Sequence, residues 1–428
     1  MKKGILETLA ALAFSTCAVA VASHHVSSAD DIARITPGLR PGDEIILADG
    51  AWKDQAIAFR AKGSAAKPVT FRAQTPGKVI FSGNSSVVIE GEHLVVSGLF
   101  LDHCDAAEDG IRISASNCRL TESAVVGGRH KFFVHFFGRS NRMDRCYLAG
   151  KTNDHPTLQV EVEGRPNFHR LDHNHFGHRP PLGRNGGETI RVGYSHQSMT
   201  NSGTLVERNF FERCDGELEI ISNKSCENTY RGNTFLDCAG MFTLRHGNRC
   251  RVEGNFIIGN HKRGSGGIRV IGEGHAIVRN HIEGVMQGGF WITSGISNSE
   301  LRGYFQARNC VIAWNTFADS RGPALELDAG IGTSRRTLRP ENIAVASNMF
   351  LLGTNGVLFK GRENETFKWR GNQVAGGSAV PRDGLEVVDA DAMRQNITRS
   401  KEISGDAPSR PLTANDVGPS WLEPDRRK

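Results

Sequence analysis

Short segments in which apolar and polar residues alternate recur along most of the chain. Residues 93–96 (HLVV), 110–113 (GIRI) and 267–270 (GIRV) are examples, and Gly or Asn punctuates the stretches between such segments. Alternation over so few residues predicts half-buried β-strands, and few stretches are long enough for amphipathic helices. The pattern therefore predicts an all-β protein built from many short strands.

An Asn followed within two positions by an apolar residue marks eight of these segments. These residues are Asn174, Asn209, Asn233, Asn255, Asn280, Asn315, Asn348 and Asn372. The intervals between them are 35, 24, 22, 25, 35, 33 and 24 residues, and earlier segments near 98, 122 and 146 keep a 24-residue step. A base step of 22–25 residues with occasional insertions of about ten is typical of stacked repeats that carry loops on some units.

Such units predict a right-handed parallel β-helix with coils of about 22–25 residues and two or three short strands in each coil. Inward-facing Asn residues at one corner of each coil would form a ladder that bonds the turn amides. A leucine-rich repeat has a similar period, but Leu is sparse at the positions that this repeat requires. We expect one β-helix domain over residues 23–400.

The two ends of the predicted solenoid differ in sequence from the repeats. Residues 28–31 (SADD) resemble a capping box that opens a short helix toward Leu39, which would cover the first coil, and residues 44–47 (EIIL) form the first predicted strand. Residues 401–428 are polar and interrupted by Pro. This tail is expected to pack on the last coil or to be loosely ordered.

The first residues match an export signal. Lys2 and Lys3 precede a run of apolar or small residues over 9–21, and residues 20–22 (AVA) suit cleavage by signal peptidase. An ordinary N-terminal helix is the alternative. The predicted signal peptide, residues 1–22, would direct the protein to the periplasm or outside the cell. No later apolar run approaches the ~20 residues that span a bilayer.

Eight Cys remain after removal of this signal, and none lies in a C-x-x-C pair. Cys214, Cys226, Cys238 and Cys250 follow one another at intervals of 12 residues, which is half of a repeat. An oxidising compartment permits disulfides. The regular spacing instead favours small apolar residues stacked in the core of the solenoid.

Composition and charge exclude several classes of protein. The chain has 428 residues, 38% of them hydrophobic, with 52 Lys and Arg against 46 Asp and Glu, a formal charge of +6. These values exclude a collagen, a polar disordered chain and a helical membrane protein. No long Lys/Arg run is present, so we expect no nucleic-acid partner. The small positive surplus is compatible with an acidic polymer as partner.

Four Gly-led stretches stack when the coils are aligned on their turns: residues 187–191, 216–220, 240–245 and 267–270. Alternation along the strands predicts that Leu218 and Ile220 point inward. The residues expected to point outward on neighbouring strands are Arg191, Glu217, Glu219, Arg245 and Arg269, and Lys224 lies near the end of the second stretch. One outer face would then gather carboxylates, an amine and guanidinium groups.

Two carboxylates on one strand face repel each other unless a cation offsets their charge, and calcium prefers oxygen ligands of this kind. A Lys with a pKa lowered by nearby positive charge could take the C5 proton of a uronic acid, which lies alpha to the carboxyl group. The oxygen at C4 would then leave, which is β-elimination. A salt-bridge network on a solvated sheet face is the alternative interpretation of the same residues.

Several stretches resemble polysaccharide lyase family 6, which contains alginate lyases and the dermatan-cleaving chondroitinase B. They are residues 185–193 (NGGETIRVG), 217–224 (ELEIISNK) and 244–247 (LRHG), with further similarity at 267–269 and 141–146. The resemblance extends over roughly residues 30–420. It implies a parallel β-helix and a calcium-assisted lyase of the poly(β-D-mannuronate) type, with alginate as the acidic polysaccharide substrate.

The resemblance also implies a role for individual residues. Lys224 corresponds to the Brønsted base and Arg245 to the proposed acid of the family. The calcium ligands would be Asn185, Glu217 and Glu219, and the substrate contacts would be Arg269, His246 and Arg191. A guanidinium keeps its proton because its pKa exceeds ~12, so water is a second candidate for the proton donor.

Three other functions stay open at this point. A dermatan sulfate lyase like chondroitinase B would use the same residues on a different polymer. A hydrolase on this scaffold would need two carboxylates as acid and base, a role open to Glu217 and Glu219. A non-catalytic glycan-binding β-helix would not need Lys224. No membrane partner is expected, and monomer and homodimer are both compatible with the sequence.

Overall fold

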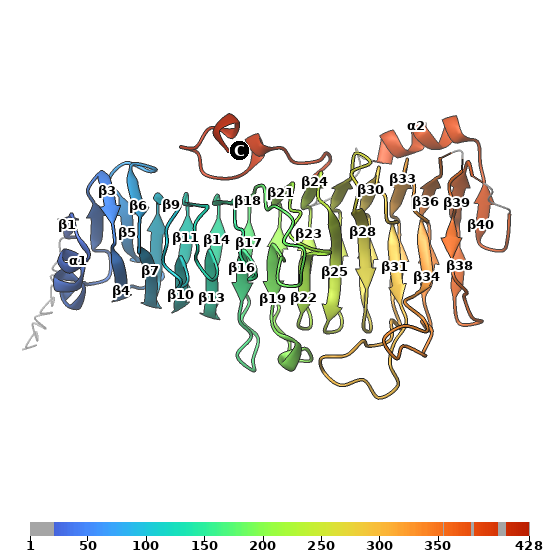
Figure 1. Ribbon diagram of the computed structural model, residues 1–428, viewed down its shortest axis with the longest axis horizontal. Coiled ribbons are helices and arrows are strands. Elements are labelled where there is room, and N and C mark those ends of the chain that lie inside the picture. The colour runs from blue at the N-terminus through green and yellow to red at the C-terminus, as the bar shows by residue number, and fades with distance from the viewer. Residues whose placement is uncertain (1–20, 354, 378–380, 401–407, 428) are drawn as a thin grey trace, which may run out of the picture.

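Three long parallel sheets form an elongated solenoid (Figure 1). The computed structural model describes residues 21–353, 355–377, 381–400 and 408–427. Each coil passes through sheet A, then sheet B, then sheet C, and each strand pairs in parallel with the strand of the same sheet in the next coil. The predicted all-β parallel β-helix is confirmed.

In the described part of the chain, sheets A and B have 14 strands each and sheet C has 12. Sheet A contains β1 Ser23–Val26, β2 Glu44–Leu47, β5 Val69–Ala73, β8 Leu94–Ser97, β11 Arg119–Thr121, β14 Arg142–Asp144, β17 Arg170–Asp172, β20 Leu205–Glu207, β23 Thr229–Arg231, β26 Arg251–Glu253, β29 Ala276–Val278, β32 Val311–Ala313, β35 Ala344–Ala346 and β38 Lys368–Arg370. Sheet B contains β3 Gly50–Lys53, β6 Val79–Ser82, β9 Leu99–Asp102, β12 Ala124–Val126, β15 Tyr147–Ala149, β18 His175–Phe176, β21 Phe210–Glu212, β24 Thr234–Leu236, β27 Phe256–Ile258, β30 His281–Glu283, β33 Thr316–Ala318, β36 Met349–Leu351, β39 Asn372–Ala375 and β40 Leu385–Val387.

Sheet C contains β4 Ala56–Lys62, β7 Ser86–Glu92, β10 Ile111–Ser116, β13 Val134–Arg139, β16 Leu158–Val160, β19 Ile190–Val192, β22 Glu219–Lys224, β25 Gly240–His246, β28 Ser265–Val270, β31 Phe290–Thr293, β34 Leu325–Ala329 and β37 Phe359–Lys360. The helices are α1 Ala29–Ile35 and α2 Ala390–Ser400, with short 3-10 turns η1 Thr36–Gly38, η2 Ser195–Gln197, η3 Ala414–Asp416 and η4 Pro424–Arg426. Neither α-helix of the described chain is long and apolar enough to cross a membrane.

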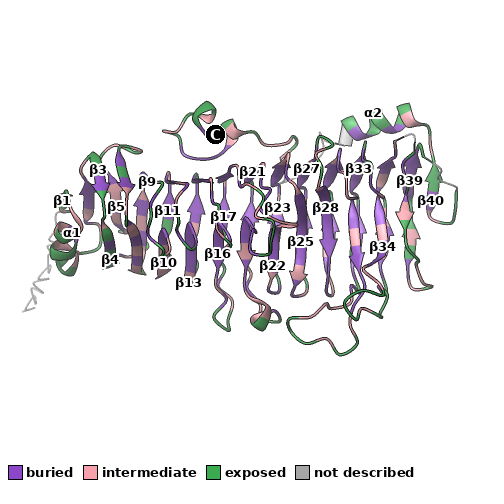
Figure 2. Cartoon of the chain, in the orientation of Figure 1, coloured by how far each residue is buried: buried purple, intermediate pink, exposed green. Residues whose placement is uncertain are grey.

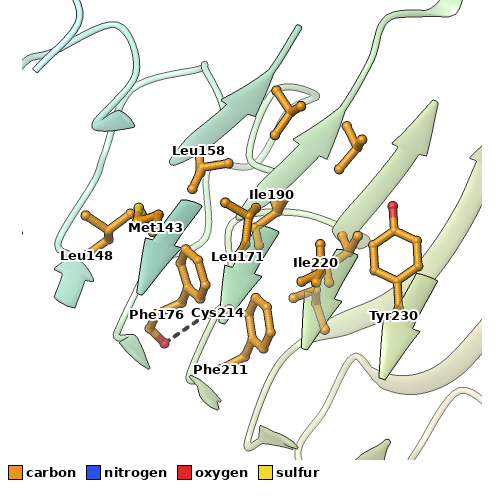
Figure 3. Close-up of a cluster of buried hydrophobic side chains, with 14 of the residues drawn as sticks. Met143, Leu148, Leu158, Leu171, Phe176, Ile190, Phe211, Cys214, Ile220 and Tyr230 are labelled. Atoms are coloured by element: carbon orange, nitrogen blue, oxygen red, sulfur yellow. Dashed lines mark hydrogen bonds between the residues drawn. The ribbon is translucent and has the colours of Figure 1, made fainter. Parts of the chain in front are cut away.

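The core consists of side chains from successive coils. Figure 2 shows buried residues in the strands along the whole length of the solenoid. In sheet B the rings of Phe176, Phe211 and Phe235 stack almost in parallel, with centroids 4.8 and 4.5 Å apart. Figure 3 shows this region, including the Cys214 thiol that donates to the carbonyl of Phe176. Removal of these apolar surfaces from water is the main stabilising contribution to each coil.

The eight Asn residues with the 22–35-residue spacing form the predicted ladder at the corner between sheets A and B. All eight are buried. Asn209 is typical: its Oδ1 accepts from the backbone and side-chain amides of Asn174, at 3.0 and 2.9 Å, and its Nδ2 donates to Asn233 Oδ1 at 3.0 Å. The ladder satisfies backbone amides that would otherwise be buried without a partner.

The Cys residues are buried and free, as the 12-residue spacing predicts. Some of them accept backbone hydrogen bonds at the other two corners: Cys118 Sγ accepts from the Leu94 amide at 3.3 Å, and Cys238 Sγ accepts from the Cys214 amide at 3.4 Å. Burial raises the pKa of the Cys118 thiol to about 11. These thiols are therefore structural and unreactive.

The N-terminal cap contains the predicted helix and one unpredicted strand. Ser28 accepts from the Asp31 amide at 3.1 Å and begins α1. β1 precedes α1 and pairs with β2, so residues 44–47 form the second strand of the described chain and not the first. The four-residue segment SHHV has no apolar alternation that would identify it. Residues 1–20 of the predicted signal peptide lie outside the described part of the chain.

The C-terminal tail differs from the expectation. Residues 408–427 run back along the outer face of sheet B, visible as the red segment along the top of Figure 1. Leu412 donates to Thr234 Oγ1 at 2.8 Å, and the Trp421 indole donates to the carbonyl of Glu122 at 2.7 Å. Helix α2, also unpredicted, packs Met393 against the last coils in place of this tail. Contacts between residues 178 and 299 positions apart leave no local pattern in the sequence.

Three long insertions occur at the same corner, between a strand of sheet C and the next strand of sheet A. They are residues 193–204, 294–310 and 330–343. In Figure 1 they extend below the strands from β19 to β34. They begin at the C-terminal ends of strands in sheet C, and Lys224 and His246 lie at the same ends of β22 and β25. The insertions therefore lie beside this part of the sheet.

Candidate active site

The strands β22, β25 and β28 of sheet C position the residues singled out in the sequence. A register shift in β22 pairs Glu219 with Met241 and Ile221 with Phe242. Both Ile220 and Ile221 are therefore buried, whereas Leu218 is partly exposed. The prediction that Leu218 points inward is wrong because a bulge adds one residue and reverses the alternation.

A second shift lies at the end of the same strand pair, where Lys224 pairs with His246. The additional residue on β25 is Arg245. This irregularity brings an amine, a guanidinium and an imidazole together at the C-terminal ends of two neighbouring strands. The structure thus places Lys224 and Arg245 on the same face, as predicted.

Three carboxylates converge beside these cations. Oxygens of Glu188, Glu217 and Glu219 all lie within 4.8 Å of one another. Glu188 is fully buried and was not predicted as a site residue. The sequence contained a signal for Glu188, because the residue lies in the stretch 187–191 that aligns with 216–220. In the structure Ile190 pairs with Ile221, and this register places Glu188 next to Glu219. Asn185, the predicted third ligand, is exposed in the preceding loop and stays a prediction.

Ser222 Oγ donates to Glu219 Oε2, but the other two carboxylates of the cluster have few hydrogen-bond donors. Burial, together with the charges of Glu188 and Glu219, raises the pKa of Glu217 to about 8. Both side-chain oxygens of Glu188 and one of Glu217 are buried without a hydrogen-bond partner. Buried carboxylate oxygens with free lone pairs are the donor set that a hard divalent cation takes. The residues of this cluster fit such an ion.

Four cationic side chains surround the carboxylates. Lys224 Nζ and Arg191 Nη1 lie 3.8 and 3.7 Å from Glu188 Oε1. Arg245 Nε and Arg269 Nη1 lie 3.7 and 3.5 Å from Glu219 Oε1. These separations are those of ion pairs and are too long for direct hydrogen bonds. The cations therefore keep donors free for an anionic ligand.

His246 is buried and neutral. Burial, then the charges of Arg245 and Lys224, lower its pKa to about 2. Its Nδ1 lies 3.5 Å from Arg245 Nη1, and its Nε2 is buried without a partner. Because this nitrogen is buried, the role of His246 in substrate contact stays a prediction.

The insertion 294–310 adds residues that the sequence did not reveal. Gly303 accepts a hydrogen bond from Arg245 Nη1 at 3.0 Å, and the Tyr304 ring centroid lies 4.3 Å from Arg245 Cζ. Arg336, from the insertion 330–343, lies 4.5 Å from the same ring. The 35- and 33-residue intervals in the Asn series indicated insertions here, but they contain no information on where a loop folds.

The family model for chondroitinase B matches residues 26–376. This chain belongs to that family, polysaccharide lyase family 6. The predicted family is confirmed. No curated protein matched this family 6 chain.

Solved structures of other family 6 proteins are similar to this one. The alginate lyase AlyGC is 33% identical, with a TM-score of 0.85 over 94% of this chain and 59% of AlyGC. A mannuronic acid-specific family 6 lyase from the human gut microbiota is 32% identical, with a TM-score of 0.82 over 94% of this chain and 97% of its own. The lyase Pedsa3628 from Pseudopedobacter saltans is 26% identical, with a TM-score of 0.79 over 93% and 99%. The present family 6 chain spans 59% of the length of AlyGC.

Proposed function

We propose that the protein is a polysaccharide lyase that cleaves 4-linked uronate chains by β-elimination, with alginate as its substrate. The observation that carries the proposal is the position of Lys224 and Arg245 on one face of sheet C, beside three carboxylates that fit a divalent cation. Membership of family 6 supports the reaction class. The names of the similar structures, two of them alginate or mannuronate lyases, support the substrate.

The chemistry follows from the acidity of the substrate. The proton at C5 of a uronate lies alpha to the carboxylate, and Lys224 in its neutral form would remove it. Electrons from the C5–H bond then form the C4=C5 double bond as the oxygen at C4 leaves. Arg245 and Arg269 would hold the sugar carboxylate, because guanidinium groups bind carboxylates with two parallel hydrogen bonds.

Glu188, Glu217 and Glu219 would hold a calcium ion, with Asn185 as a further candidate ligand. When bound, the ion would stabilise negative charge that develops on the uronate carboxylate. Arg191 would extend the cationic surface toward β16, where its Nε donates to Gln159 Oε1 at 2.7 Å. His246 would contact a hydroxyl of the sugar beside Lys224.

The proposal is tested by ultraviolet absorbance of the new double bond during incubation with polymannuronate, polyguluronate, dermatan sulfate and polygalacturonate. We expect absorbance to rise with the alginate polymers. A rise with dermatan sulfate alone would make the protein a dermatan lyase. Release of reducing ends without absorbance would indicate a hydrolase, and no reaction with any polymer would contradict a lyase.

Lys224→Ala should reduce turnover by at least about a thousandfold, because the base for the C5 proton is lost. The matched control is Lys368→Ala, which removes an exposed amine on β38 of sheet A. Both variants should keep the melting temperature of the wild type. Wild-type turnover in Lys224→Ala would show that another group is the base.

A further inference from the structure

We propose that the hydroxyl group of Tyr304 donates the proton that the oxygen at C4 takes as it leaves. This inference rests on the proposed lyase function and assigns a catalytic role to a residue of the insertion 294–310. The insertion returns over β25, where Arg245 Nη1 donates to the Gly303 carbonyl at 3.0 Å. Tyr304 is thereby held directly against the predicted catalytic guanidinium.

Three guanidinium groups from three elements surround Tyr304. Arg245 on β25 and Arg336 in the insertion 330–343 lie 4.3 and 4.5 Å from the ring centroid. Arg269 on β28 lies 5.6 Å from the centroid. A guanidinium has only hydrogen-bond donors, so none of these three groups can take the phenolic proton. The phenolic proton therefore stays available for another acceptor.

The same surroundings stabilise the phenolate that remains after proton transfer. Burial opposes ionisation of Tyr304, but the charges of Arg245, Arg269 and Arg336 outweigh it and lower the pKa of the phenol. A donor with a pKa closer to the working pH transfers its proton to a sugar oxygen more readily. The arginines thus act here as fixed positive charges beside the group that loses the proton.

The other polar groups around Arg245 are less suited to this role. The Arg245 guanidinium stays charged and is engaged with Gly303 and Glu219. His246 is neutral, and a neutral imidazole is a very weak acid. Glu217 belongs to the carboxylate cluster that fits a cation. Solvent water is the remaining donor, and the activity of Tyr304→Phe distinguishes it from Tyr304.

The proposed elimination conserves protons and electron pairs. The Lys224 amine takes the proton from C5, and the electron pair of the C5–H bond forms the C4=C5 double bond. The bond between C4 and its oxygen breaks with its electron pair on the oxygen. The oxygen takes the Tyr304 proton and leaves as a hydroxyl group on the released fragment. Tyr304 then recovers a proton from solvent, and Lys224 loses one.

The first test is Tyr304→Phe, which removes the hydroxyl but keeps the ring that packs against Arg245. We expect kcat on alginate to fall at least about a hundredfold, the usual contribution of a general acid, with KM within about threefold of the wild type. The matched control is Tyr147→Phe, which removes a buried, unpartnered hydroxyl on sheet B and should leave kcat unchanged. Circular dichroism and melting temperature would show that both variants fold.

The second test uses a synthetic uronoside that carries a 4-nitrophenyl ether at C4. Nitrophenolate leaves without a proton, so Tyr304→Phe should cleave this substrate at nearly the wild-type rate, whereas Lys224→Ala should lose activity on both substrates. An equal loss of activity on both substrates in Tyr304→Phe would show that the hydroxyl positions the substrate and does not donate the proton. A kcat on alginate within threefold of wild type would leave water as the donor, and either result would overturn the proposal. Failure of the wild type on every uronate polymer would instead contradict the proposed function itself.

Discussion

At the scale of single residues, the candidate site combines carboxylates that repel one another with cationic side chains that offset their charge. Lys224, Arg245 and Arg269 come together as the strand alternation and the family resemblance implied. Glu188 was missed although it lies within a stretch used for the alignment, because its neighbours in space depend on the β19–β22 register. Tyr304 was missed because a loop places it, and loop conformation has no periodic signal.

The buried carboxylate Glu188 gives a prediction about cation binding. Glu188→Gln keeps the shape of the side chain but removes one of the three carboxylates proposed as ligands, so calcium affinity should fall at least about tenfold. Isothermal titration calorimetry on protein treated with a chelator measures the affinity directly.

The matched control for this prediction is Glu386→Gln, an exposed residue on β40. It should leave calcium affinity unchanged. Equal affinities in Glu188→Gln and the wild type would remove Glu188 from the proposed ligand set.

At the scale of elements, the coil repeat was predictable because the Asn ladder requires one residue type at one corner of each coil. The intervals between these residues gave both the coil length and the places of the insertions. The two register shifts in β22 and β25 were not predictable. A bulge adds one residue to a strand, and neither the composition nor the length of the coil repeat marks its position. An interpretation based on strict alternation therefore assigned Leu218 to the core.

The ladder predicts a large cost for one lost amide. Asn255 Oδ1 accepts from both the backbone and the side-chain amide of Asn233, at 2.9 Å each, and Asn255 Nδ2 donates to Asn280 Oδ1 at 2.9 Å. Asn255→Ala leaves these groups buried and unpaired, so unfolding free energy should fall by about 2–4 kcal/mol. Urea denaturation followed by circular dichroism measures it.

Asn396→Ala is the control for this prediction, since Asn396 is exposed on α2. It should change stability by less than about 0.5 kcal/mol. A similar small change in Asn255→Ala would mean that water replaces the lost ladder bonds.

At the scale of the whole molecule, the candidate site and the C-terminal tail lie on different sheets. The candidate site occupies sheet C, whereas the C-terminal tail covers part of sheet B. Trp421 packs there against Phe100, with ring centroids 5.7 Å apart. The position of the tail was not predictable, because its partners lie 178 to 299 residues earlier in the chain.

This separation predicts that the tail contributes stability without affecting turnover. Trp421→Ala removes a large partly buried ring, so unfolding free energy should fall by about 2 kcal/mol while kcat stays unchanged. Trp314→Ala is the matched control, because Trp314 is 55% exposed, and it should have a smaller effect on stability. Thermal unfolding and the absorbance assay measure the two quantities, and a reduced kcat in Trp421→Ala would connect the tail to the site.

The common corner of the three insertions has a consequence for how substrate preference can diverge. Coil register is fixed at the opposite corner by the buried amides, so a turn at the sheet C corner can lengthen without moving the strands. Each doubling of a flexible loop costs only about 0.6 kcal/mol in closure entropy. Selection can thus remodel the loops at this corner one turn at a time, while the coils beneath them stay constant.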